Sequence, residues 1–134
     1  MEAFVNVVIA NLRRAVGIDA VIAAIGVPAA KGIVVSIDLH VGEVTWVFPQ
    51  PLALALVEKM LAVPDPSPEL AVDGATELAN ILTGQAMGAL EKHGFRCQLG
   101  PPRVHVGDLP RGASVRMATS AGPIDLVLRL APAA

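Results

Sequence analysis

The stretch from residue 70 to residue 92 constrains the fold most, because its hydrophobic pattern fits one long helix. Read at about 100° per residue, its apolar side chains return to a single side, as they do on a helix packed against a core. That side consists of Ala71, Ala75, Leu78, Leu82, Ala86 and Ala89. We therefore predict an amphipathic helix here, with this side buried.

The opposite side of the predicted helix is polar. Glu77 and Asn80 are three positions apart, so their side chains are neighbours on the helix surface. Asp73 lies one turn before Glu77, and Gly84 lies one turn after Asn80. Glycine inside a helix costs about 1 kcal/mol relative to alanine, which favours a packing or contact reason for Gly84. Helix geometry alone favours a solvated surface for Glu77 and Asn80.

Other residues of this helix leave their roles open. Met87 and Glu91 extend the polar side towards the helix end, either as peripheral contacts or as ordinary surface. Gly74, near the helix start, is expected to loosen the first turn. Asp73 either contacts a partner or interacts with the helix dipole near the N-terminus, and the dipole is the favoured explanation.

The whole sequence predicts helices and strands in the order α-β-β-β-α-α-β-β-β. Alternation of apolar and polar residues, together with turn residues, indicates six strands near 18–26, 32–40, 43–48, 95–106, 113–119 and 123–130. Helices are predicted over 2–15, 52–61 and about 68–94. One sheet with helices packed on one face satisfies this order, so we predict a single α/β (α+β) domain over residues 1–134.

Single residues mark several boundaries of these elements. Gly17 is placed to end the first helix, and Ser67 is placed to cap the last one. A hairpin is predicted around residues 41–43. Pro101 and Pro102 indicate a strand break or a sheet edge, because proline cannot donate to a central ladder.

Composition excludes several classes of function. A net charge of −2, without Lys/Arg clusters among aromatic residues, gives no basis for nucleic-acid binding. The longest apolar run, residues 20–30, is shorter than the roughly 20 residues of a membrane helix. Arg13 and Arg14 follow the first apolar stretch, the reverse of a signal peptide. We therefore predict a cytoplasmic protein without membrane contacts.

Apolar residues make up 54% of the chain, which favours a second subunit that covers part of the surface.

No residue pattern predicts a metal centre or a nucleophilic hydrolase. Cys97 is the only cysteine, which excludes an internal disulfide, and the three histidines fit no zinc-ligand spacing. The sequence contains no nucleophile elbow, Walker sequence or dinucleotide-binding glycine motif. We expect no metal ion bound by this chain alone.

The segment from Pro68 to Leu109 combines the polar helix side with a second set of residues. An acidic residue precedes Glu-x-x-Asn, a glycine follows one turn later, and a helix-ending glycine is followed by a strand with Pro-Pro and glycine. These residues are Asp73, Glu77, Asn80, Gly84, Gly94, Pro101, Pro102 and Gly107. In this spacing the segment resembles the CheX branch of the CheC/CheX chemotaxis phosphatases. The chain holds one Glu-x-x-Asn site, as in that branch, whereas some relatives carry two.

The resemblance implies a phosphatase that hydrolyses the phospho-aspartate of a CheY-type response-regulator receiver in chemotaxis or two-component signalling. Asn80 would then orient the attacking water, and Glu77 would pair with the active-site lysine of the receiver. Gly84 would leave clearance for the receiver, and Asp73 would be a further contact. The receiver would supply Mg²⁺, so this chain would need no cofactor of its own. The resemblance also implies a homodimer paired through sheet edges.

Two alternatives remain open on the sequence. The chain could be a non-enzymatic receiver-binding module related to the flagellar switch proteins, or a structural domain whose helix is merely solvated. A pure docking module would have no need for the water-orienting Asn80, so the intact Glu77/Asn80 pair argues for the enzyme.

Overall fold

The computed structural model describes residues 2–27, 31–39, 42–62, 64–92, 99–107 and 114–130. The elements follow one another in the predicted order: α1 (Glu2–Val16), β1 (Ala20–Val27), β2 (Gly32–Leu39), β3 (Gly42–Phe48), α2 (Gln50–Leu61), α3 (Pro68–Glu91), β4 (Arg103–Gly107), β5 (Ser114–Thr119) and β6 (Gly122–Leu130). No helix among these residues is long and apolar enough to cross a membrane.

The six strands form one antiparallel sheet in the order β1-β5-β6-β3-β2-β4. Strands β2 and β3 form the predicted hairpin, in which Leu39 pairs with Gly42. Strands β5 and β6 form a second hairpin, in which Thr119 pairs with Gly122. The two edges are therefore β1 and β4, which are far apart in the sheet.

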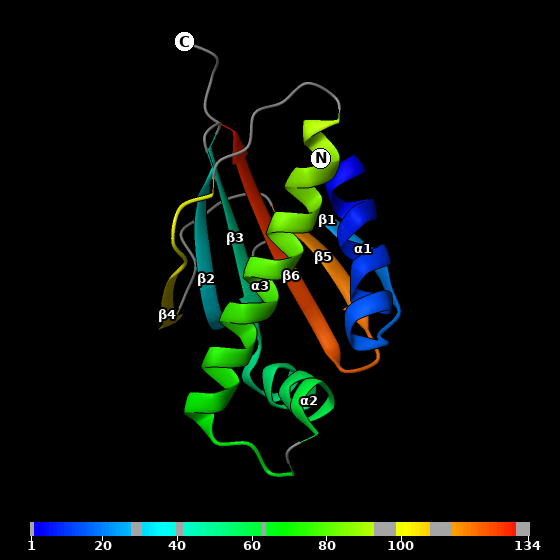
Figure 1. The fold of residues 1–134 in the computed structure, drawn as a ribbon. Coiled ribbons are helices and arrows are strands. Elements are labelled where there is room, and N and C mark those ends of the chain that lie inside the picture. Colours follow the sequence, from blue (N-terminus) through cyan, green and yellow to red (C-terminus); the bar gives the residue numbers. More distant parts are fainter. Residues whose placement is uncertain are drawn as a thin grey trace.

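The helices cover one face of this sheet, as predicted. Figure 1 shows α1 and α3 side by side across the face, with α2 near one end of the sheet. Trp46 of β3 lies in the middle of the core between Phe4 of α1 and Phe48, with ring centroids 6.3 Å away in both cases. This aromatic group joins the helix layer to the centre of the sheet.

The opposite face of the sheet carries ion pairs between neighbouring strands. The Arg103 guanidinium contacts Asp38 at 2.8 Å and Glu43 at 2.7 Å, and the hydrogen bond to Glu43 raises the pKa of Arg103. Arg116 donates from Nε to Oδ1 of the buried Asp125 at 2.8 Å. These pairs connect the edge strand β4 to β2 and β3, and connect β5 to β6.

Helix α3 begins and packs through short-range features that its sequence encodes. The Ser67 hydroxyl accepts the Leu70 N–H at 3.2 Å, so the predicted N-cap is confirmed. Gly74 does not loosen the helix start, because α3 is helical from Pro68 onwards. A Cβ atom at Gly74 would overlap Cγ2 of Val57 in α2. The glycine therefore allows α2 and α3 to pack closely.

Of the predicted strand over 95–106, residues 95–98 lie outside the described residues, and residues 100–102 are not in a regular strand. Leu99 makes a single bridge to Leu39, and the regular strand begins only at Arg103, after Pro101 and Pro102. Strand β4 is an edge strand, which confirms the interpretation of the two prolines. The predicted helix end at Gly94 lies outside the described residues.

Candidate functional site

The candidate site is a row of residues on the side of α3 that faces away from the core. Asp73, Glu77 and Asn80 are exposed and Gly84 is half-buried, while Leu78 and Leu82 on the opposite side are buried. We call Asp73, Glu77, Asn80 and Gly84 the α3 stripe. At 1.5 Å per residue, the stripe is about 16 Å long. The predicted site residues thus lie together on one helix surface.

The polar side chains of the stripe have no partners within the part of the chain that the structure describes. Asp73, Glu77 and Asn80 make no side-chain hydrogen bond or ion pair there. The nearby Thr76 differs, because its hydroxyl donates to the Val72 carbonyl at 2.7 Å. A carboxylate and a carboxamide are therefore both exposed and available to another molecule.

The described residues do not require a glycine at position 84 for their packing. A Cβ atom at this position would lie 3.8 Å from Cδ1 of Leu99, which is ordinary van der Waals contact. Gly74, in contrast, is required by Val57. The described part of the fold therefore offers no reason for a glycine next to Asn80, which favours a contact with another molecule.

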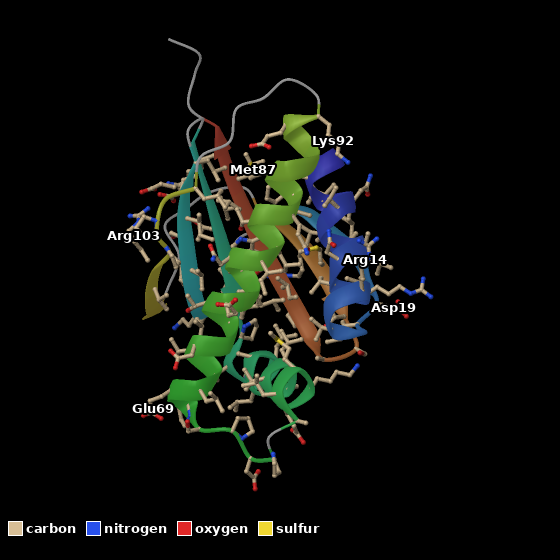
Figure 2. All side chains as sticks on the ribbon, viewed as in Figure 1. Arg14, Asp19, Glu69, Met87, Lys92 and Arg103 are labelled. Atoms are coloured by element: carbon tan, nitrogen blue, oxygen red, sulfur yellow. The ribbon has the colours of Figure 1, made fainter. Side chains whose placement is uncertain are left out.

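The stripe ends before the last turn of α3. Met87 is only 2% exposed, so the interpretation of this residue as surface is wrong. Helical periodicity placed Met87 on the same side as Asn80, but Met87 belongs to the hydrophobic core. Glu91 is exposed, as expected. Figure 2 shows Glu69 at the start of α3, Met87 nearer its other end, and Arg103 on β4.

One internal hydrogen bond holds α3 to the sheet beside the stripe. The Trp46 Nε1–H of β3 donates to the Thr83 hydroxyl at 2.9 Å, and both side chains are fully buried. The sequence analysis missed this pair. The available signal was the single tryptophan of the chain in an apolar strand, because a buried indole N–H needs an acceptor.

The stripe lies on a helix surface, and a groove in the described part of the chain lies elsewhere. That groove has a volume of about 670 Å³ between α1 and β1 and is lined by residues such as Asn6, Ile9 and Val21. It includes none of the four stripe residues. Nor do the described residues contain a cluster of three or more His, Cys, Asp or Glu side chains that could hold a metal ion.

Comparisons with known proteins identify similar chains. The family model described as chemotaxis phosphatase CheX matches residues 32–119, a range that includes the entire stripe. No curated protein sequence matches the chain.

Solved structures show the same fold. A CheX protein from Desulfovibrio desulfuricans is 24% identical, with a TM-score of 0.77 over 96% of this chain and 97% of that one. A CheX protein from Vibrio vulnificus is 19% identical, with a TM-score of 0.80 over 96% and 93%. The CheX–CheY–BeF₃–Mg²⁺ complex from Borrelia burgdorferi contains a chain that is 20% identical, with a TM-score of 0.79 over 98% and 97%.

Proposed function

Because the chain belongs to the CheX family of chemotaxis phosphatases, we propose that it hydrolyses the phospho-aspartate of a CheY-type receiver domain. The observation that carries this proposal is the exposed pair of Glu77 and Asn80 on α3, neither of which is engaged by the described residues. The Borrelia burgdorferi relative was solved as a complex with CheY, BeF₃ and Mg²⁺, which supports a receiver as the partner.

Asn80 has the side chain that the proposed hydrolysis needs. Phosphoryl transfer requires an in-line nucleophile and charge stabilisation, with little covalent chemistry from the protein. A carboxamide both donates and accepts hydrogen bonds, so it orients a water molecule without changing its own protonation state. An aspartyl phosphate is already an activated acyl phosphate, so positioning of the water is the main contribution.

Glu77 has a different role, because a carboxylate only accepts hydrogen bonds. On the helix surface it lies next to Asn80, where it pairs with the active-site lysine of the receiver and fixes the docked geometry. The receiver brings the phosphorylated aspartate and its Mg²⁺. Asp73 and Gly84 extend the contact, with Gly84 leaving space for the backbone or side chains of the receiver.

The receiver is a cytoplasmic partner, so we expect this chain in the cytoplasm.

A homodimer paired through a sheet edge is part of the same proposal. The β1 edge exposes apolar side chains, with Val21 at 64% and Ile25 at 75%, which is unusual for an edge strand in contact with water. The β4 edge instead carries Arg103 in its ion pairs. Pairing through β1 would leave α3 accessible on both subunits. Light scattering at micromolar concentration tests this assembly, and a monomer would contradict it.

The experiment that tests the function is the decay of a phosphorylated CheY-type receiver with Mg²⁺. The wild-type chain should accelerate decay, and Asn80→Ala should remove this acceleration while it still binds the receiver with beryllofluoride. Glu77→Ala should weaken both binding and turnover. Binding without acceleration by the wild type would indicate the docking module, and absence of both would leave α3 as a solvated surface.

A further inference from the structure

The hydrogen bond between Trp46 and Thr83 lies next to the proposed catalytic residue. Thr83 follows Asn80 by three residues and directly precedes Gly84. The Trp46 Nε1–H donates to its hydroxyl at 2.9 Å, and both residues are 0% exposed. At about 100° per residue, Asn80 and Thr83 are separated by about 60° around the helix. A rotation of α3 that moves one of them therefore moves the other.

The donor of this hydrogen bond is rigidly placed. Trp46 pairs with Val35 on one side and with Leu126 on the other, in the middle of the sheet. Its ring stacks on Phe48 with an interplanar angle of 10° and contacts Phe4 of α1. The indole N–H thus provides a fixed point for α3 at the centre of the sheet.

The buried α3 surface mixes large and small side chains, and Leu78, Leu82 and Met87 are its large members. Much of it is alanine, namely Ala71, Ala75, Ala79 and Ala86. Methyl groups give a smooth surface with few protruding side chains that interlock with the sheet. A directional hydrogen bond at Thr83 adds, next to Asn80, an orientation that the alanine methyl groups cannot supply.

Small rotations matter for the chemistry. With side chains extending about 5–6 Å from the helix axis, a roll of about 10° displaces the Asn80 carboxamide by about 1 Å. A displacement of about 1 Å can cost about 100-fold in rate, because the attacking water must be aligned with the phosphorus. Docking of a whole receiver surface tolerates the same displacement more easily.

We propose that Trp46 and Thr83 are positioning residues, which fix the rotation of α3 so that Asn80 meets the phosphoryl group in alignment. This inference rests on the proposed phosphatase function. It predicts that loss of the hydrogen bond lowers kcat while the affinity for the receiver is largely kept.

The chain offers a matched control on the same helix. Thr76 lies seven residues before Thr83, and its hydroxyl donates to Val72 of its own helix at 2.7 Å. Thr76→Val therefore removes a threonine hydroxyl from α3 without removing a link to the sheet. Thr83→Ser is the conservative variant that keeps the acceptor for Trp46.

Thr83→Val should lower kcat by about tenfold or more at saturating receiver. Its Kd for the receiver with beryllofluoride should change by less than about threefold. Thr76→Val and Thr83→Ser should keep both kcat and Kd near the wild-type values. Trp46→Phe should resemble Thr83→Val, and the double variant should be no worse than either single one.

Unchanged kcat in Thr83→Val, or equal losses of kcat in Thr83→Val and Thr76→Val, would overturn the proposal. Thr83→Ala replaces Thr83→Val if the latter does not fold.

A measurement that needs no phosphatase activity separates this inference from the proposed function. The side-chain amide NMR signals of Asn80 should shift in Thr83→Val and stay in place in Thr76→Val, while the single indole N–H signal of Trp46 reports loss of the hydrogen bond. A wild type without activity would overturn the phosphatase proposal, and the positioning claim would then be decided by these signals. If the Asn80 signals do not move in Thr83→Val, the positioning claim is overturned.

Discussion

Helices α1 and α3 lie side by side on one face of the sheet, and each carries a differently used asparagine. In α1, Asn11 is 7% exposed and its Nδ2 donates to the Val7 carbonyl at 2.8 Å. In α3, Asn80 is exposed and has no side-chain partner among the described residues. A carboxamide that is bonded to its own helix cannot orient a water for another molecule. The residue type is therefore not sufficient, and its exposure decides what it can do.

The residues three positions before Asn11 and Asn80 also differ, one being buried and apolar and the other exposed and acidic. Three residues before Asn11 stands Val8, which is fully buried in the core, whereas Glu77 stands three residues before Asn80. Each helix precedes three strands, so the two halves have the same order of elements. Despite this, α1 places Val8 and Asn11 in the packed interior, whereas α3 presents Glu77 and Asn80 to the outside. The prediction of a single Glu-x-x-Asn site rests on this difference and on Asn6, which follows Glu2 by four residues rather than three.

The largest expected effect comes from the same substitution at both asparagines. Asn80→Asp removes the donors and adds a negative charge towards the phosphoryl group, so turnover should fall by about 100-fold with stability almost unchanged. Asn11→Asp places a carboxylate against the Val7 carbonyl and should destabilise the fold by about 1–3 kcal/mol. Receiver decay assays and urea unfolding measure the two effects. A lower kcat in folded Asn11→Asp would contradict the division of roles between α1 and α3.

Glycines provide the second difference, because α3 contains Gly74, Gly84 and Gly88 and α1 contains none. Gly74→Ala should destabilise the fold by about 1–3 kcal/mol, since the new methyl group overlaps Val57 and a β-branched side chain adjusts poorly. Urea unfolding measures this loss. Val57→Ala in the same background removes the overlapping methyl group and should recover part of the stability. Equal stability of Gly74→Ala and wild type would show that α2 shifts at little cost.

The sequence predicted those features that depend on local spacing. Periodicity located α3 and its stripe, and Ser67 marked the first turn, because both signals lie within a few residues along the chain. It was wrong about Met87, since the cover over that residue comes from tertiary structure rather than from the helix. The bond between Trp46 and Thr83 spans 37 residues and depends on how α3 lies on the sheet. The function of Glu77 and Asn80 remains a prediction.

Gly74 and Gly84 show the same limit within one helix. Both are glycines in an otherwise regular helical pattern, and the sequence indicated a contact at Gly84 but not the packing role of Gly74. The atoms around each position distinguish them: Val57 leaves no space at Gly74, whereas Leu99 lies at ordinary contact distance from Gly84. Packing explains the first glycine, whereas the described residues give no packing reason for the second.

The smallest expected effect separates Gly84 from Gly88 on α3. A Cβ atom at Gly88 would meet no described atom within 4 Å, and one at Gly84 would only touch Leu99. Both alanine variants should therefore stabilise the fold by about 0.4–1 kcal/mol, because alanine loses less backbone entropy in a helix. If Gly84 provides clearance for the receiver, Gly84→Ala should weaken receiver binding several-fold while Gly88→Ala leaves it unchanged. Calorimetric titration with the beryllofluoride-bound receiver measures this difference, and equal affinities would show that the receiver does not approach α3 at Gly84.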